Sequence, residues 1–288
     1  MVLKQQKYDA VLIIGNGFDL NLGLKTEYSN FVLSDQFSEL LLRNNNLAKH
    51  LKEINELKDW IDIEKELKNY SKNHPERYRN FFEDFKSLST ALQAYLNTID
   101  FDNINKSSEA YKLISKIKKH KVLIIDFNYT PTISKICKEF EIDLNAESCN
   151  IEHFKIHGSL DTNDIIFGVE DSADIFSHHI FLKKSVNKNF NPINFTPALR
   201  DCKLFIVFGH SLGKTDHMYF DELFFNASHN LMNTGGKTMI FHHYGENYYY
   251  ALYEQIDKLT RQSIKQLKDF NEVQFSNIKD ERESSVLQ

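Results

Sequence analysis

Cysteine, proline and glycine are all scarce in this chain of 288 residues, which has 3, 4 and 10 of them. The cysteines, Cys137, Cys149 and Cys202, are scattered and form no C-x-x-C pair. A disulfide framework or a cysteine-rich zinc site is therefore not expected. The prolines form no linker-like run, and the chain has no internal repeat and no low-complexity tract.

Long apolar runs are also missing, so no segment is expected to span a bilayer. The first residues, Met1 to Lys7, lack a signal-peptide pattern, which predicts a cytoplasmic protein without a membrane partner. The formal net charge of -5 argues against a general nucleic-acid binder, because such a protein needs a basic surface.

Seven short apolar runs bounded by turn residues or charges predict buried strands. They are Ala10–Ile14, Val122–Asp126, His153–Ile156, Ile165–Gly168, Leu204–Phe208, Thr238–Phe241 and Val273–Phe275. Four helical patterns lie between them, at Pro131–Phe140, Ala173–Lys184, Asp216–Met232 and Asn247–Leu267. Alternating strands and helices predict an α/β, Rossmann-like fold with a mostly parallel sheet that helices cover on both faces.

One long region breaks this alternation. From about Phe31 to Lys119 there is no convincing strand, and stretches such as Phe81–Leu96 carry apolar residues at helical spacing. We therefore predict a core formed by residues 1–30 and 120–288, with a helical insertion over residues 31–119.

Three of the ten glycines follow the first predicted strand within nine residues, at Gly15, Gly17 and Gly23. A strand that ends in Gly-x-Gly can bring backbone N–H groups close to a phosphate. The G-x-G-x-x-G pattern is incomplete, because Leu20 stands where the third glycine belongs, so a sharp turn without a ligand is an equal alternative. Asp19 either hydrogen-bonds a ribose hydroxyl or caps the next helix. A P-loop motif does not occur.

Polar residues follow three more predicted strands. They are the segments Asp126–Thr130, His157–Ser159 and Gly209–Gly213. The carboxyl ends of parallel strands share one edge of a sheet, and ligands bind there. The sequence therefore predicts that these residues converge on one crevice.

The order and spacing of these motifs resemble the AbiH family of bacterial abortive-infection proteins. The resemblance rests on the following segments, which extend over nearly the whole chain: Gly15-Asn16-Gly17-Phe18-Asp19, Gly23-Leu24-Lys25-Thr26, Trp60-Ile61-Asp62-Ile63-Glu64, Phe127-Asn128-Tyr129-Thr130, His157-Gly158-Ser159 and Gly209-His210-Ser211-Leu212. It implies a role in defence against phage.

That family in turn is similar to sirtuin-like proteins, which implies an NAD glycohydrolase with NAD as substrate and no separate cofactor. By this resemblance Asn128 and His157 carry the chemistry. The residues implied to bind NAD are Gly15, Asn16, Gly17, Phe18, Asp19, Thr26, Gly158, Gly209 and Ser211. Deacetylating sirtuins hold a four-cysteine zinc ribbon, which this chain cannot build, so protein deacetylation is not expected.

The bond between ribose and nicotinamide in NAD is already activated, because the leaving ring carries positive charge. An oxocarbenium-like transition state follows, and the protein has mainly to position NAD and a water. Asn128 is suited to orient water and a ribose hydroxyl, and His157 to act as general base. Without the resemblance, His157 is better explained as a hydrogen-bonded histidine at a strand end.

Other polar residues suggest less. The pairs His178-His179 and His242-His243 have no carboxylates at ligand spacing, so no metal is expected. Trp60, Asp62 and Glu64 either close the site from the helical insertion or begin a helix that Asp62 caps.

Two alternatives to an NADase stay open. Gly209–Gly213 is a literal G-x-S-x-G, which suggests an α/β-hydrolase-type esterase with Ser211 as nucleophile and with Asp216, Asp221 and His242 or His243 as partners. That interpretation leaves Gly15, Asn128 and His157 unexplained. The other alternative is a nucleotide-sensing module without catalysis.

Partners are predicted only in general terms. A homo-oligomer is the default expectation for a protein of this kind. An unrestrained NAD hydrolase would deplete the NAD of the cell. We therefore expect the resting protein to be latent until a partner protein or a phage-derived trigger activates it.

Overall fold

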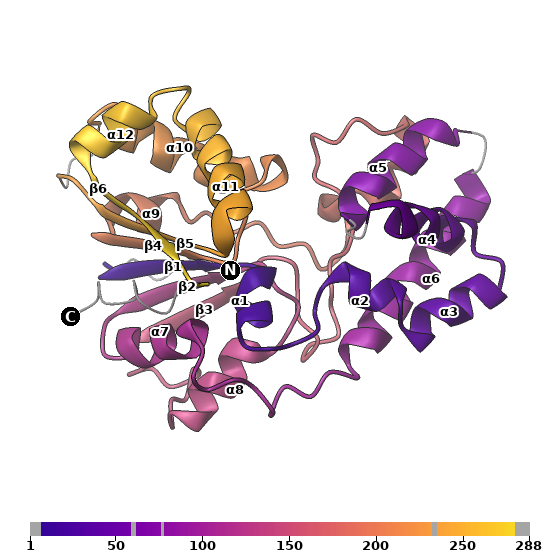
Figure 1. Ribbon diagram of the computed structural model, residues 1–288, viewed down its shortest axis with the longest axis horizontal. Coiled ribbons are helices and arrows are strands. Elements are labelled where there is room, and N and C mark those ends of the chain that lie inside the picture. The colour runs from indigo at the N-terminus through magenta and orange to yellow at the C-terminus, as the bar shows by residue number, and fades with distance from the viewer. Residues whose placement is uncertain (1–6, 59–61, 76–77, 232–234, 280–288) are drawn as a thin grey trace.

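A six-stranded, all-parallel sheet forms the centre of the computed structural model, which describes residues 7–58, 62–75, 78–231 and 235–279 (Figure 1). The strands lie in the order β3-β2-β1-β4-β5-β6. Their bounds are β1 Ala10–Ile14, β2 Val122–Asp126, β3 Ile151–Lys155, β4 Leu204–Phe208, β5 Thr238–His243 and β6 Glu272–Asn277. The direction of the strand order reverses between β1 and β4, which makes this pair the topological switch point of the sheet.

The predicted α/β, Rossmann-like fold class is confirmed, and β1, β2 and β4 have the predicted bounds. The expected strand at Ile165–Gly168 is wrong. Among the described residues that segment joins no sheet, and the bridge beside it, between Val169 and Lys183, is isolated. The side chains of Ile165 and Phe167 are instead buried in the apolar cluster that also contains Phe85. The ring of Phe167 stacks on that of Phe85 with centroids 5.6 Å apart.

Helices cover both faces of the sheet, and this explains the uninterrupted apolar runs. Ala10, Leu12 and Ile14 of β1 face one apolar cluster, and Val11 and Ile13 face the other. The first cluster is covered by α1 (Asn16–Asn21), α7 (Glu109–Ile117) and α8 (Thr132–Glu139). The second is covered by α9 (Thr196–Asp201), α10 (His217–Ser228), α11 (Gly245–Leu259) and α12 (Ile264–Phe270). A strand buried on both faces needs apolar residues at every position.

Two predicted helices differ from the structure. The segment Ala173–Lys184 forms no α-helix. It contains the 3-10 helix η1 (Ser177–Leu182) and the first residue of a second 3-10 helix, η2 (Lys184–Val186). The two are separated by Lys183, whose extended backbone (ψ 130°) forms the bridge to Val169. Asn247–Leu267 is divided into α11 and α12, because Arg261 and Gln262 between them have positive φ angles. Met232, the predicted end of α10, lies outside the described residues.

A lobe of five helices lies to one side of the sheet (Figure 1). They are α2 (Tyr28–Val32), α3 (Asp35–Leu42), α4 (Asn46–Lys58), α5 (Ile63–Asn73) and α6 (Tyr78–Leu96). Asp62 caps α5 by accepting a hydrogen bond from the backbone N–H of Lys65 at 3.0 Å, which confirms the capping interpretation. Trp60 lies outside the described residues.

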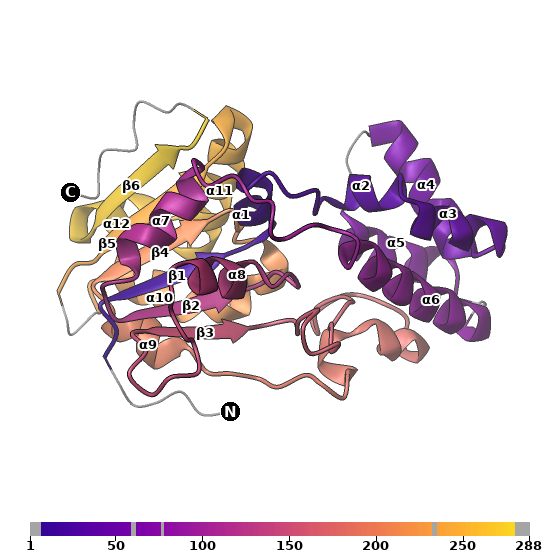
Figure 2. The same ribbon diagram turned by 90° about the horizontal axis from the view of Figure 1, so that it is seen from below.

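The chain returns to this lobe later in the sequence. Figure 2 shows the segment after β3, which carries η1 and η2, running from the sheet to the helices and back. There His179 of η1 contacts Phe81 of α6 with ring centroids 4.8 Å apart. Helix α7 belongs to the predicted insertion by sequence, yet it covers the sheet. The division of the chain into domains stays a prediction.

No helix in the described part of the chain is both long and apolar enough to cross a membrane.

The loops after β1 and β4 are in backbone contact at the switch point. The N–H of Gly17 donates to the carbonyl of Gly209 at 2.9 Å. A Cβ on Gly17 would lie 2.6 Å from Cα of Gly209, and a Cβ on Gly209 would lie 2.2 Å from the backbone N of Phe18. Gly209 also has φ +66°, a conformation that L side chains rarely adopt. Both positions therefore require glycine.

We expect Gly209→Ala to lower the free energy of unfolding by about 3 kcal/mol or more, because left-handed strain and overlap with backbone atoms add. Gly23→Ala is the matched control. Gly23 has φ +85°, but a Cβ there meets nothing within 4 Å. We expect Gly23→Ala to lower the free energy of unfolding by only about 1–2 kcal/mol, which is the cost of the left-handed backbone strain alone. Urea denaturation measures both, and equal costs would contradict the contact.

Candidate functional site

The backbone N–H groups of the loop after β1 already have protein acceptors. Gly15 N donates to Phe208 O at 3.2 Å, and Phe18 N donates to Gly15 O at 2.8 Å. With the bond from Gly17 to Gly209, two of the three residues predicted to cradle a pyrophosphate, Gly15 and Gly17, have their N–H groups used within the protein. A phosphate would compete with these carbonyls, and the phosphate cradle stays a prediction.

Other residues of the glycine motif hold this loop together. Asn16 is exposed, and its Oδ1 accepts a hydrogen bond from Thr26 Oγ1 at 2.6 Å. This bond joins the two halves of the motif across α1. Phe18 is fully buried, and its ring packs edge-on against Phe208 with centroids 5.5 Å apart. Its side chain therefore serves the core, and a ligand would meet only its backbone.

Asp19 is a carboxyl group completely inside the protein. Its Oδ2 accepts a hydrogen bond from Thr130 Oγ1 at 2.6 Å, and its Oδ1 has no partner among the described residues. Burial raises the pKa of Asp19 from 3.8 to about 6, and the hydrogen bond from Thr130 offsets only part of that effect. Asp19 does not cap α2, whose N-cap is Glu27, and it does not reach the surface.

The carboxylate of Asp126 organises the loop after β2. It contacts Lys155 Nζ at 2.6 Å and His153 Nε2 at 2.9 Å, and it accepts a hydrogen bond from Asn128 N at 2.8 Å. Burial alone would raise the pKa of Asp126, but Lys155 and His153 outweigh it and the pKa is lowered. An ionised carboxylate thus fixes the backbone that carries Asn128.

Asn128 is buried and reaches the loop after β1. Its Nδ2 donates to the carbonyl of Gly15 at 3.1 Å. Its own backbone carbonyl accepts a hydrogen bond from Lys155 Nζ at 3.0 Å. The structure therefore brings two of the predicted site residues, Asn128 and Gly15, into direct contact.

His157 is buried at the carboxyl end of β3, and its two ring nitrogens differ. Nε2 lies 3.4 Å from Nζ of Lys184, whereas Nδ1 has no partner in the described part of the chain. An ammonium group can only donate, so Nε2 is the acceptor and the neutral ring carries its proton on Nδ1. Burial, and next the charge of Lys184, hold the pKa of His157 well below 6.5.

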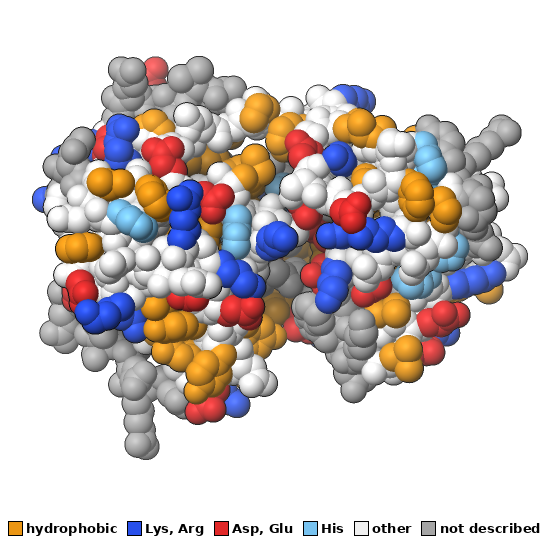
Figure 3. All heavy atoms as spheres, turned by 90° about the horizontal axis from the view of Figure 1, so that it is seen from above, with side chains coloured by type: hydrophobic (Ala, Val, Ile, Leu, Met, Phe, Trp, Pro, Cys, Tyr) orange, Lys and Arg blue, Asp and Glu red, His pale blue; other side chains and the backbone are white. Residues whose placement is uncertain are grey.

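Lys184 joins the site to the helical lobe. It lies on η2, and its Nζ forms an ion pair with Oε1 of Glu64 on α5 at 2.8 Å. Seen from above, the surface is hollowed between the sheet and the lobe, with charged side chains on both sides (Figure 3). The prediction that Glu64 lies near the site is consistent with this contact. Lys184 was missed, because a lysine in a polar segment gives no sequence signal.

A second pair of ionisable side chains, His210 and Asp216, lies beside His157. His210 Nδ1 accepts a hydrogen bond from Leu212 N at 3.0 Å, so its Nε2 carries a proton toward Asp216 Oδ2, 3.3 Å away. Burial opposes ionisation of Asp216, but the bond from His210 prevails and lowers its pKa to about 2. The ring of Phe127 lies between, 5.6 Å from His157 and 4.2 Å from His210 by centroids.

Ser211 lies in the exposed loop between β4 and η3 (Lys214–Asp216). No hydrogen bond to its Oγ forms among the described residues. Asp216 is paired with His210, and Asp221 is exposed on α10. His242 packs against Phe208 on the face of the sheet that α7 covers. His243 Nδ1 lies 3.1 Å from the backbone carbonyl of Gly245. Among the described residues the structure therefore does not bring a Ser-His-Asp triad together.

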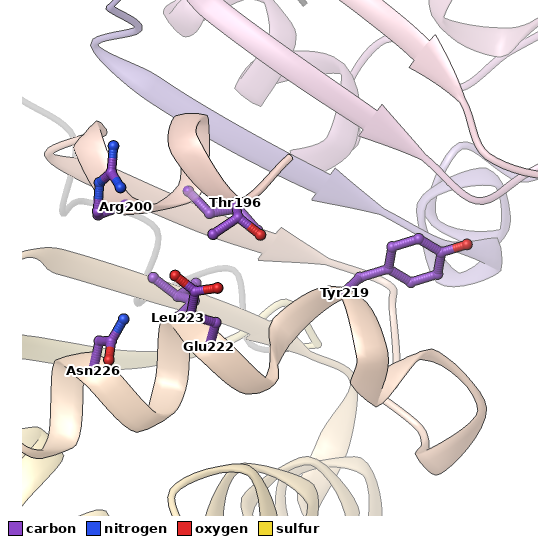
Figure 4. A pocket seen from close by; sticks show the side chains of 7 residues that line it. Thr196, Arg200, Tyr219, Glu222, Leu223 and Asn226 are labelled. Atoms are coloured by element: carbon purple, nitrogen blue, oxygen red, sulfur yellow. The ribbon is translucent and has the colours of Figure 1, made fainter. Parts of the chain in front are cut away.

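A shallow pocket lies elsewhere, between α9 and α10 (Figure 4). It is lined by Thr196, Leu199, Arg200, Tyr219, Glu222, Leu223 and Asn226. None of the predicted site residues belongs to it. Figure 4 shows the Tyr219 side chain pointing away from the other residues, and its ring meets Phe127 at 5.6 Å. In the described ranges no three His, Cys, Asp or Glu side chains are placed to hold a metal ion.

The family model described as bacteriophage abortive infection AbiH matches residues 11–234, which is well over half of the chain. The matched range includes the loops after β1, β2, β3 and β4, and with them Asn128, His157, Lys184 and Glu64. No curated protein and no solved structure matches the chain.

Asp19→Asn should stabilise the protein more at pH 7 than at pH 4. The pKa of Asp19 is raised by folding, so its contribution to stability is present at low pH and is lost as the pH rises toward about 6. Asparagine carries no such cost. We expect the difference in free energy of unfolding between variant and wild type to grow by about 2 kcal/mol between pH 4 and pH 7. Urea denaturation at both pH values measures it, and a constant difference would contradict the buried ionisation.

Ser211 should not become acylated. A fluorophosphonate probe labels a serine that a base activates through a hydrogen bond. Both ring nitrogens of the neighbouring His210 are directed elsewhere, Nδ1 to Leu212 N and Nε2 to Asp216 Oδ2. We expect the same low labelling of wild type and Ser211→Ala, measured by intact-protein mass spectrometry. Stoichiometric labelling that Ser211→Ala abolishes would instead support the esterase alternative.

Proposed function

The chain belongs to the AbiH family of bacteriophage abortive infection proteins, and from this premise we propose that it acts by hydrolysing NAD to nicotinamide and ADP-ribose. The proposal extends to a distant relation with sirtuin-like NADases. Its support is the order of the loops around the switch point, where glycines follow β1, Asn128 follows β2, His157 follows β3 and Gly209 follows β4.

The Nδ1 of His157, which has no hydrogen-bond partner among the described residues, is the observation that carries the proposal. A buried N–H without an acceptor costs roughly 1–3 kcal/mol. Such a group is seldom left unsatisfied, so a ligand or water is its natural partner. It lies at the carboxyl edge of the sheet, where open α/β folds bind ligands. A ribose hydroxyl or the attacking water offers the oxygen that this donor lacks.

The reaction needs little proton transfer before bond cleavage. The C1′–nitrogen bond breaks as its electron pair neutralises the pyridinium ring, and water then adds to C1′ and releases a proton. We assign Asn128 and His157 to holding the ribose and the water. General-base action by His157, expected from the sequence, requires a free lone pair, and Lys184 contacts the one on Nε2. Donation through Nδ1 is therefore the role that this arrangement favours.

The helical lobe and any trigger belong to the same proposal. Glu64 of α5 is bound to Lys184 within the site. A movement of the lobe would therefore displace Lys184 and change its contact with His157. Self-association and relief of latency by a phage component or partner protein stay predictions from the sequence.

Asn128→Ala and His157→Ala should each reduce NAD consumption by the purified protein at least about 100-fold, since each removes a group that positions the reacting atoms. Asn150→Ala and His120→Ala are the matched controls, because both residues are exposed and lie just before β3 and β2, at the opposite edge of the sheet. Release of nicotinamide and ADP-ribose, followed by chromatography, measures the rate.

Thermal unfolding of each variant separates loss of chemistry from loss of fold. Full turnover by a folded Asn128→Ala or His157→Ala would remove the assigned residue from the reaction. NAD binding without any product, from wild type in the presence of lysate from phage-infected cells, would favour the sensing module over the NADase.

A further inference from the structure

We propose that Lys184 is a positioning residue of the candidate site, which fixes the proton of His157 on Nδ1 while Glu64 holds the lysine in place. Three elements far apart in sequence meet in this contact: α5 carries Glu64, η2 carries Lys184, and the loop after β3 carries His157. The two distances are 2.8 Å from Lys184 Nζ to Glu64 Oε1 and 3.4 Å from Nζ to His157 Nε2.

The direction of the effect follows from the donors and acceptors. The ammonium group has three hydrogens and no lone pair, so a ring with Nε2–H would set two donors against each other. The ring proton is thereby placed on Nδ1, the atom without a protein partner among the described residues. Lys184 thus selects which ring nitrogen is offered to a ligand as a donor.

Glu64 keeps the lysine charged inside the protein. The Lys184 side chain is only 8% exposed, and an isolated ammonium group there would lose its proton easily. Burial lowers the pKa of Lys184, but the charges of Glu64 and Asp216 raise it above its ordinary value. Without Glu64 the site would hold a buried cation with less compensation.

The charged and titratable groups around His157 come from four elements. Lys184 of η2 and His210 after β4 disfavour its protonation, whereas Asp216 of η3 and Asp126 of β2 favour it. Burial also disfavours protonation of His157, as Lys184 and His210 do, so the ring stays neutral. Replacing Lys184 by an uncharged residue removes an opposing charge, so the titration midpoint of His157 must move upward.

A role in packing alone would predict something different. The contact between Lys184 and Glu64 also tethers the helical lobe to the segment after β3, and a tether has no effect on the ring proton. The position of that proton therefore distinguishes the two roles, whether or not the protein hydrolyses NAD. Only the kinetic consequence, a loss of NAD turnover when the Nδ1–H donor is lost, rests on the proposed function.

The test is NMR of the whole chain labelled with 15N-histidine, in which two-bond 1H–15N correlations distinguish Nδ1–H from Nε2–H. His157→Gln assigns the signal. We expect Nδ1–H in wild type and in Lys184→Arg, which keeps a donor cation. Lys184→Met should shift the ring toward Nε2–H and raise its titration midpoint. Lys188→Met, at an exposed lysine four residues away, should match wild type.

The outcomes separate cleanly. An Nε2–H ring in wild type would overturn the inference, even if Lys184→Met fails to fold. An unchanged ring and midpoint in folded Lys184→Met would overturn it as well. If the protein hydrolyses NAD, kcat/KM should fall in Lys184→Met, where the Nδ1–H donor is lost, and should be retained in Lys184→Arg. An Nδ1–H ring without NAD hydrolysis by any preparation would sustain the inference and remove the proposed function.

Discussion

The backbone contact between the loops after β1 and β4 is the constraint on which the rest of this molecule depends. Gly17 and Gly209 approach so closely that a side-chain carbon on either would overlap with backbone atoms. Because the two loops touch, the carbonyl of Gly15 is placed where the Asn128 amide reaches it. His210, next to Gly209, is likewise set against the ring of Phe127. The glycines thus give the fold a close contact at its switch point, and this function is independent of any phosphate.

Around that contact the site is built from buried charges that compensate one another. Asp126 is paired with Lys155 and His153, Asp216 with His210, and Lys184 with Glu64. Each pair loses hydration energy on burial, and each regains it only while both partners keep their geometry. Of the buried polar atoms without a hydrogen-bond partner among the described residues, two belong to this site, Asp19 Oδ1 and His157 Nδ1, and they call for explanation. We interpret the histidine as a ligand contact and the aspartate, which is entirely enclosed, as a cost of the fold.

Much of the sheet could be predicted because burial on both faces leaves a local signature. The apolar runs of β1, β2 and β4 are bounded by charges and glycines, and their observed ends agree with the predicted ones. Ile165–Gly168 carries the same signature but is buried by the helical lobe, since an apolar run reports burial and not hydrogen bonding. The segment Ala173–Lys184 was predicted as one helix from its local pattern. The bridge between Lys183 and Val169 is a tertiary contact, which the spacing of residues does not show.

The sequence by itself determined the parallel α/β fold, the placement of polar loops at the carboxyl ends of β1 to β4, and the resemblance to AbiH proteins that the family match then established. These follow from local patterns of apolar residues and from motifs, and both can be recognised in the order of residues along the chain. Only the tertiary structure decided that Lys184 contacts His157, that Glu64 is its partner, and that His210 and Asp216 pair with each other while Ser211 forms no hydrogen bond to either of them among the described residues. The residues in these contacts are separated by up to 120 positions in the chain. Their proximity depends on the path of the segment after β3 to the helical lobe and back, and no local preference encodes that path.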